Sequence, residues 1–144
     1  MIIQKSRVKL KNPILICAFP SVGMVGRYVV NYLVSELNPN VYAEVDMQEY
    51  ITPHNVIVEN GIIYSTYIRE SIYYLRYREN DFLFFFSDFE PSLKNLEKFN
   101  NDFLDFISHL NVSMIITFNG IPSNILHTDI PKIFFAKTED LKFV

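Results

Sequence analysis

The sequence has no tryptophan, a single cysteine and no excess of positive charge. The one cysteine, Cys17, excludes an internal disulfide, and its place in the apolar run Ile14–Phe19 predicts a buried thiol rather than a nucleophile. The formal net charge of −3 argues against a nucleic-acid partner, because nucleic-acid-binding domains usually carry a basic face. In place of tryptophan, 13 phenylalanines and 9 tyrosines can fill a large core.

Export and membrane signals are also lacking. Residues 1–10 contain no apolar stretch typical of a signal peptide, and the apolar runs Ile14–Phe19 and Phe82–Phe86 have the length of strands rather than of membrane spans. The 144 residues suffice for one domain and are few for two. We therefore expect a single cytoplasmic domain over residues 1–144 that does not bind membranes.

Residues that hold metals or perform nucleophilic catalysis are sparse. The histidines His54, His109 and His127 have no metal-ligand spacing to another ligand, apart from the weak pair of His127 with Asp129. No serine or cysteine has an identifiable base partner, so a catalytic triad has no support. The sequence thus predicts no metal, no cofactor and no catalytic residue.

The spacing of apolar residues predicts a layered α/β domain. Amphipathic helices are expected after Ser21, as far as Leu37, and after Ser92, as far as Leu110, with the two serines as N-caps. The dipeptide Asn60-Gly61 predicts a β-hairpin. Buried strands are expected at Ile14–Phe19, Phe82–Phe86, Met114–Phe118 and Ile133–Phe135. This order favours a largely parallel central sheet with an antiparallel hairpin or meander inserted between the first two long strands.

The first strand leads into a glycine-containing turn that could hold a phosphate. Only half of a dinucleotide fingerprint is present, because Ser21 stands where its first glycine would be and only Gly23 and Gly26 follow. Gly23 would allow a tight turn, and Gly26 would let the helix lie close to the strand. Helix N-termini nevertheless attract anions. A structural turn is favoured, and an anion site stays open.

Polar residues at the ends of the other buried strands extend this candidate site. Ligands in open α/β sheets collect beyond the carboxyl ends of the strands, where Asp88, Glu90 and Asn119 are expected to lie near Ser21, Gly23 and Gly26. Two carboxylates could perform acid–base chemistry or bind a metal, or could simply face water. The alternative function is therefore a small-molecule or nucleotide-binding protein or enzyme that uses this rim.

Tyrosines crowd the region between the predicted hairpin and the strand Phe82–Phe86. Tyrosine is enriched at protein–protein contacts, so this group is either one packed sheet face or a partner surface, and the sequence favours neither. Its members are Tyr64, Tyr67, Tyr73, Tyr74 and Tyr77.

The run Phe19–Leu33 resembles the signature of the proteasome assembly chaperone family, second-subunit type, which has many archaeal and some bacterial members. That signature is a strand, then Pro-[Gly/Ser]-x-Gly-x-x-Gly, then a helix with Asn/Asp-Tyr-Leu. The matching residues are Pro20, Ser21, Gly23, Gly26, Asn31, Tyr32 and Leu33. Softer matches follow at Pro53, at Ser87–Pro91 and at Ile115–Pro122, with Ser87 and Asn119 in place of family glycines.

The resemblance implies an α/β fold like that of nucleoside phosphorylases, without their active site. Members often carry an ATP-grasp superfamily label, but this sequence lacks the lysine- and carboxylate-bearing elements that such enzymes use to hold nucleotide and magnesium. The better-understood members act without ATP in proteasome α-ring assembly, and they self-associate. The resemblance therefore implies a non-enzymatic assembly chaperone or oligomeric scaffold with proteasome α-subunits as partners.

The C-terminal end departs from the family pattern. Archaeal members can dock through a hydrophobic-Tyr-x tail, whereas this sequence ends in Lys142-Phe143-Val144. Family members also continue with a further helical segment. The sequence is therefore expected to be either a truncated piece or a short paralogue, and neither is expected to dock on the proteasome through its tail. If a C-terminal layer is absent, one face of the sheet would lie bare, which would favour a partner or an oligomer.

Overall fold

The computed structural model describes residues 1–52, 56–65, 67–122, 124, 128, 130 and 132–138. Pro53, His54, His127, Asp129 and the tail Lys142–Val144 lie outside these residues. The elements, in chain order, are β1 (Ile2–Gln4), β2 (Ile14–Ala18), the 3-10 turn Val22–Met24, α1 (Val25–Leu37), β3 (Asn40–Asp46), the 3-10 turn Met47–Glu49, β4 (Val56–Glu59), β5 (Ile62–Ser65), β6 (Arg69–Tyr77), β7 (Asn80–Phe86), α2 (Leu96–His109) and β8 (Met114–Thr117).

The described strands form a six-stranded sheet in the order β1-β3-β6-β7-β2-β8 and a separate two-stranded sheet of β4 and β5. The α/β class is confirmed, but the expectation of a largely parallel sheet is wrong. Only β2 is parallel to its neighbours β7 and β8, and the pairs β1–β3, β3–β6 and β6–β7 are antiparallel. The reason is a short connection: only Arg78 and Glu79 join β6 to β7, whereas parallel strands need a crossover of about a dozen residues.

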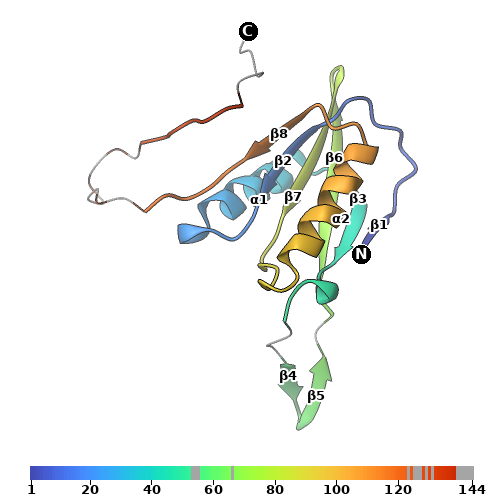
Figure 1. Cartoon of the computed structure of the whole chain (residues 1–144), viewed down its shortest axis with the longest axis vertical. Helices are drawn as coiled ribbons and strands as arrows, with labels where there is room; N and C mark the ends of the chain where they lie inside the picture. Colours follow the sequence, from blue (N-terminus) through green and yellow to red (C-terminus); the bar gives the residue numbers. More distant parts are fainter. Residues whose placement is uncertain are drawn as a thin grey trace.

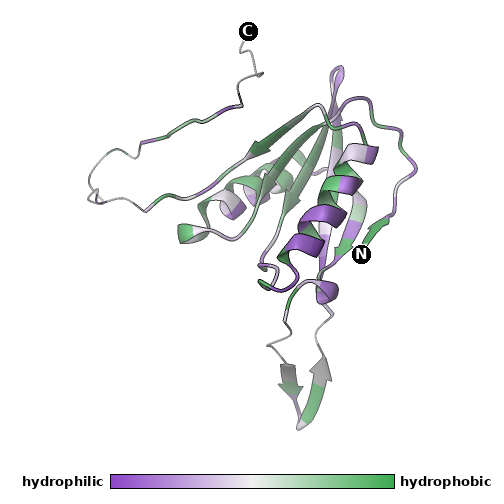
Figure 2. Cartoon of the chain, in the orientation of Figure 1, coloured by the Kyte–Doolittle hydropathy of each residue, from purple (hydrophilic) through white to green (hydrophobic). Residues whose placement is uncertain are grey.

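Helices α1 and α2 cover opposite faces of the sheet (Figure 1). On the α1 face, Val30 packs with Ala18 and Phe84. On the α2 face, Phe99, Phe103 and Ile107 pack against Leu15, Cys17 and Phe85, together with residues of β3 and β6. Strand β2 is accordingly apolar along its whole length and β7 is apolar from Phe82 to Phe86, while α2 is polar on its outer side (Figure 2). This two-sided burial explains the continuous apolar runs of β2 and β7.

Both helices begin later than the sequence indicates. Helix α1 begins at Val25, after a 3-10 turn, and the Ser21 side chain does not cap it. Helix α2 begins at Leu96 with Asn95 in the N-cap position, so the predicted cap at Ser92 is also wrong. The Ser92 amide instead donates a hydrogen bond to the carbonyl of Tyr50. This bond connects the loop before α2 to the 3-10 turn after β3.

The hairpin prediction is confirmed, and the last predicted strand is wrong. Asn60 and Gly61 both have positive φ, 52° and 77°, as a tight hairpin turn requires, and they connect β4 to β5. This hairpin projects from the body of the domain (Figure 1). Residues Ile133–Phe135 form no strand, and their side chains are exposed. An apolar extended segment becomes a strand only when it pairs with another strand, and the two sheets of the described residues do not include this segment.

Candidate functional site

Backbone contacts close the glycine turn. Gly23 adopts φ 66°, which turns the chain between β2 and α1. Gly26 lies against the residue that follows β8: a Cβ at position 26 would stand 2.1 Å from the carbonyl oxygen of Phe118. A Cβ at Gly120 would stand 2.0 Å from the carbonyl oxygen of Val22. Two glycines on separate segments thus let the turn and the chain after β8 pack backbone to backbone.

Ser21 belongs to the same contact. Its Oγ accepts a hydrogen bond from the backbone N–H of Gly120 at 3.4 Å. The Ser21 hydroxyl, which the sequence placed in a possible anion site, therefore bonds the backbone of the protein itself. Asn119, between Phe118 and Gly120, is exposed. Of the predicted rim, the structure brings together Ser21, Gly26 and the segment around Asn119, and it does so by packing rather than around an open cleft.

Asp88 forms an ion pair with Arg27 of α1 and not a carboxylate pair with Glu90. The Arg27 Nε and Nη2 groups donate to the two carboxylate oxygens of Asp88, with 3.0 Å between Nη2 and Oδ2. This hydrogen bonding raises the pKa of Arg27, whose guanidinium also lies 6.0 Å from the ring centre of Phe86. Glu90 is exposed, and no hydrogen bond or ion pair joins it to the described rim residues.

A buried carboxylate beside Asp88, Glu70, was not predicted from the sequence. Its side chain is buried at the start of β6 and accepts hydrogen bonds from the Asp88 N–H at 3.0 Å and the Ser87 hydroxyl at 3.3 Å. Burial raises the pKa of the Glu70 carboxyl, and these hydrogen bonds oppose that shift. The period-2 alternation could have indicated its burial, because Glu70 shares a strand face with Ile72 and Tyr74.

The predicted tyrosine group is divided between surfaces. Tyr73 stacks with Phe86 on the α1 side, whereas Tyr74 contacts Tyr42 edge-on on the α2 side. Tyr67 is exposed and donates a 2.5 Å hydrogen bond to Asp46, which lowers the pKa of that carboxyl. Tyr77 is exposed near the end of β6, and the side chain of Tyr64 lies outside the described part. Alternation along β6 is the reason that neighbouring tyrosines face opposite ways.

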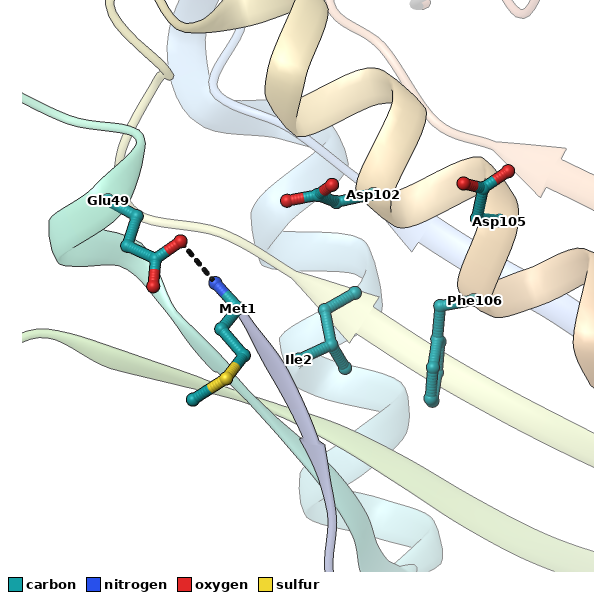
Figure 3. Close-up of a pocket in the computed structure, with 6 residues that line it drawn as sticks. All are labelled: Met1, Ile2, Glu49, Asp102, Asp105 and Phe106. Atoms are coloured by element: carbon teal, nitrogen blue, oxygen red, sulfur yellow. Dashed lines mark ion pairs between the residues drawn. The ribbon is translucent and has the colours of Figure 1, made fainter.

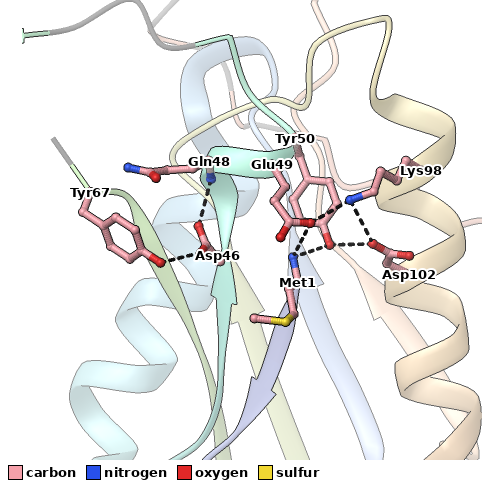
Figure 4. Close-up of polar contacts among 8 residues, drawn as sticks. All are labelled: Met1, Asp46, Gln48, Glu49, Tyr50, Tyr67, Lys98 and Asp102. Atoms are coloured by element: carbon pink, nitrogen blue, oxygen red, sulfur yellow. Dashed lines mark hydrogen bonds and ion pairs between the residues drawn. The ribbon is translucent and has the colours of Figure 1, made fainter. Parts of the chain in front are cut away.

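A second polar cluster joins the start of the chain to α2, and no sequence motif indicated it. The Tyr50 hydroxyl donates to Asp102 at 2.7 Å and accepts from the Met1 ammonium at 2.7 Å (Figure 4). Burial and the bond to Asp102 raise the pKa of Tyr50. Lys98 forms ion pairs with Glu49 at 2.7 Å and with Asp102 at 3.7 Å. These contacts hold the 3-10 turn after β3 against α2.

A depression of about 420 Å³ lies beside this cluster (Figure 3). Its carboxylates Glu49 and Asp102 are already paired with cations, and the Met1 ammonium lies 3.3 Å from Glu49. Among the residues that the structure describes, no group of three or more His, Cys, Asp or Glu side chains could hold a metal ion. Two of the carboxylates that line the depression are therefore already used in contacts within the chain. The depression is lined by Met1, Ile2, Glu49, Asp102, Asp105 and Phe106.

The family profile of PAC2 matches residues 15–142, which is most of the chain. This chain belongs to the PAC2 family. The resemblance predicted from Phe19–Leu33 is thereby confirmed. A comparison with curated proteins finds no significant match. Within the described part of this PAC2 chain, neither helix is long and apolar enough to cross a membrane.

Solved structures of other proteins share the fold. PbaB of Pyrococcus furiosus, an archaeal proteasome activator, is 20% identical and superposes with a TM-score of 0.64 over 80% of this chain and 48% of its own. The proteasome-assembly chaperone homologue of Mycobacterium tuberculosis is 18% identical with a TM-score of 0.58, over 71% of this chain and 47% of its own. PbaA of Pyrococcus furiosus, an archaeal homolog of proteasome-assembly chaperone, is 17% identical with a TM-score of 0.55, over 80% and 46%. The chain thus spans about half the length of these structures.

One helix of this PAC2 chain carries apolar side chains on its outer side. Val25, Tyr28 and Tyr32 follow one another at steps of three and four along α1, and the two tyrosines are 60% and 62% exposed. Val22 precedes them and Ile121 is exposed just beyond Gly120, which contacts Val22. We call these five residues the α1 stripe. Tyr32 also belongs to the family signature, so the signature contributes an exposed aromatic residue as well as packing glycines.

Proposed function

We propose that this chain is a non-enzymatic assembly chaperone or oligomeric scaffold whose partners are proteasome α-subunits. Membership of the PAC2 family supports this function, and so does the fold shared with proteasome-assembly chaperone homologues. The observation that carries it is a contrast between two neighbouring surfaces. The glycine turn is packed against backbone, while the α1 stripe presents apolar groups to solvent.

The contrast favours protein binding over chemistry. Ser21 bonds Gly120 and Asp88 pairs with Arg27, so these two polar side chains of the rim already have partners within the chain. Exposed tyrosines at helical spacing are typical of protein interfaces, where aromatic side chains supply much of the binding energy. The alternative of a small-molecule or nucleotide-binding enzyme gains no support. Self-association, and a closer relation to the nucleoside phosphorylase fold, are further parts of the proposal.

A binding measurement with purified proteasome α-subunits tests the function. The tagged chain is expected to capture α-subunits, and Tyr28→Ser with Tyr32→Ser should weaken that binding at least about tenfold, because losing an interface aromatic costs on the order of 1–2 kcal/mol each. The matched control is Leu93→Ser, since Leu93 is 93% exposed and lies on another surface, before α2. Absence of binding by the unmodified chain would contradict the proposed function.

The two predicted contact surfaces can be separated in the same experiment. Tyr67→Ser and Tyr77→Ser change the exposed members of the tyrosine group and leave α1 intact. If binding is lost through these substitutions and survives those in α1, the partner surface is the tyrosine group. If the reverse holds, the α1 stripe is the contact.

A further inference from the structure

The chain between β1 and β2 displays lysine and arginine side chains at every second position. From residue 5 to residue 11, exposed and partly buried residues alternate without a break, as they do along an extended chain. The segment passes along the outside of the sheet in Figure 1. All four exposed positions carry a positive charge, in a chain whose formal net charge is −3. We call these four residues the basic strip: Lys5, Arg7, Lys9 and Lys11.

The backbone under the basic strip is held against the domain. The partly buried Leu10 packs against the core on the α2 face. At one end, the backbone N–H of Lys5 donates to the carbonyl of Tyr42 at 2.8 Å. At the other end, the backbone N–H of Lys11 donates to the Asp81 carboxylate at 2.7 Å. The cations are therefore presented from a segment that is fastened at both ends.

Asp81 is the centre of the second anchor. Its side chain is 3% exposed and accepts hydrogen bonds from the Arg76 guanidinium at 2.6 and 2.9 Å, in addition to the bond from Lys11. Arg76 also donates to the carbonyl of Lys9 at 3.1 Å. The bonding to Arg76 lowers the pKa of Asp81, so this carboxylate is ionised at neutral pH. Because Asp81 is paired with Arg76, its charge does not neutralise the basic strip.

Three of the four cations in the basic strip have no acidic partner within the described part of the chain. Lys5 forms an ion pair with Glu44 at 3.1 Å. Arg7, Lys9 and Lys11 form no ion pair with any residue that the structure describes. Alternate residues of an extended chain are about 6–7 Å apart. Carboxylates at every second position of an extended peptide have the same spacing, so such a peptide matches the strip in both charge and period.

We propose that the basic strip is a docking surface for an acidic, extended segment of another protein. Opposite charges facing each other would give the contact its specificity and its rate of association, as they do at other protein interfaces. A short protein segment is favoured over a nucleic acid because the strip is a single row of cations. The rest of a long polyanion would meet a chain whose net charge is negative.

This surface is separate from the α1 stripe. The basic strip follows β1, which lies at the opposite edge of the main sheet from β8, whereas the α1 stripe includes Ile121, which lies beyond β8. The inference therefore goes beyond the proposed function and does not rest on it.

Fluorescence anisotropy with a labelled peptide that alternates Glu and Ser over about twelve residues tests the docking surface. The original chain is expected to bind this peptide at low salt and to lose affinity as salt screens the charges. Arg7→Gln with Lys9→Gln should weaken binding about three- to tenfold, because each exposed ion pair contributes modestly. The matched control, Lys94→Gln with Lys132→Gln, changes the net charge equally at two exposed sites elsewhere and should leave the affinity unchanged.

Asp81→Asn separates the arrangement of the basic strip from its charge. This substitution removes a negative charge, which alone would strengthen peptide binding, but it also weakens the anchor at Lys11, so binding should fall. Glu44→Gln is the control, because it removes a negative charge that pairs only with side chains, and it should bind at least as tightly as the original. Tighter binding by Asp81→Asn would overturn a surface that depends on a fixed strip. Circular dichroism verifies folding, and the paired Gln variants decide the proposal if Asp81→Asn does not fold.

Three further results would overturn the proposal. The original chain could fail to bind the peptide at low salt. The two double variants could weaken binding equally, which would make net charge rather than the basic strip responsible. A single-stranded thymidine oligonucleotide with about the same number of charges could bind more tightly than the peptide, which would assign the strip to a nucleic acid. Capture of proteasome α-subunits is measured separately with the α1 substitutions, so the failure of either idea leaves the other standing.

Discussion

Gly26 of α1 rests directly on the carbonyl group of Phe118, so that a Cβ on Gly26 would lie 2.1 Å from the Phe118 oxygen. This contact joins the first helix to the chain that leaves the edge strand β8. It also accounts for a glycine in a helix, where alanine would ordinarily be more stable by about 0.5–1 kcal/mol.

The first prediction weighs the helix preference for alanine against the close contact of Gly26 with the Phe118 carbonyl. Gly26→Ala should lower the free energy of unfolding by about 1–3 kcal/mol, because backbone must move to admit the methyl group. Chemical denaturation measures the change. Asn31→Ala, an exposed site on the same helix, is the control and should have little effect. A Gly26→Ala protein as stable as the original would show that helix and strand can separate at no cost.

The Arg27–Asp88 ion pair gives the second prediction. Both side chains are partly exposed, so the pair should contribute only about 0.2–1 kcal/mol, and its contribution should fall as salt screens it. A double-mutant cycle with Arg27→Gln and Asp88→Asn, repeated at low and high salt, measures the coupling. A coupling energy that does not change with salt would mean that water is excluded from the pair.

The third prediction concerns Tyr50, whose hydroxyl bridges to Asp102. Tyr50→Phe keeps the buried ring and removes both 2.7 Å hydrogen bonds of the hydroxyl, to Asp102 and from the Met1 ammonium. We expect a loss of about 1 kcal/mol in unfolding free energy. Tyr28→Phe removes a hydroxyl from an exposed ring and serves as the control. Equal stabilities for the two variants would mean that water replaces Tyr50 as the partner of Asp102.

Local features of the sequence predicted local features of the fold. Gly23 and Gly26 indicated a tight turn and a close helix contact, and Asn60-Gly61 indicated the hairpin, because each depends on backbone freedom at those positions. Features that depend on distant partners were not predictable in this way. Arg27 and Asp88 are 61 residues apart, and no sequence pattern around either residue indicates that the two form a pair.

The same reasoning explains the errors in strands and caps. Ile133–Phe135 has a strand's composition, but composition cannot supply the neighbouring strand that hydrogen bonding requires. Ser21 and Ser92 have the chemistry of N-caps, yet both are used to fasten one segment to another: Ser21 through its hydroxyl to Gly120, Ser92 through its amide to Tyr50. Tertiary contacts decided these positions in place of helix-end propensity.

Glu70 gives the last prediction, which concerns pH. Its pKa in the folded protein is raised above the ordinary value of 4.5, chiefly by burial. The folded state therefore holds this proton more tightly than the unfolded state, and the stability linked to Glu70 is fully present below pH 4.5 and is lost as pH rises through the raised folded pKa. Glu70→Gln cannot ionise and should lack this loss, while its amide oxygen can still accept from the Asp88 N–H.

The measurement is the difference in unfolding free energy between Glu70→Gln and the original protein as a function of pH. Asp46, Glu49 and Asp81 have lowered pKa values, so the stability that each contributes is lost only as pH falls to acidic values. Both proteins contain all three carboxyls, so their contributions cancel in the difference between the two unfolding free energies. Relative to the original, Glu70→Gln should gain stability as pH rises above 4.5 and level off beyond the folded pKa. A flat difference would mean that hydrogen bonds from Ser87 and Asp88 fully offset the burial of this carboxylate.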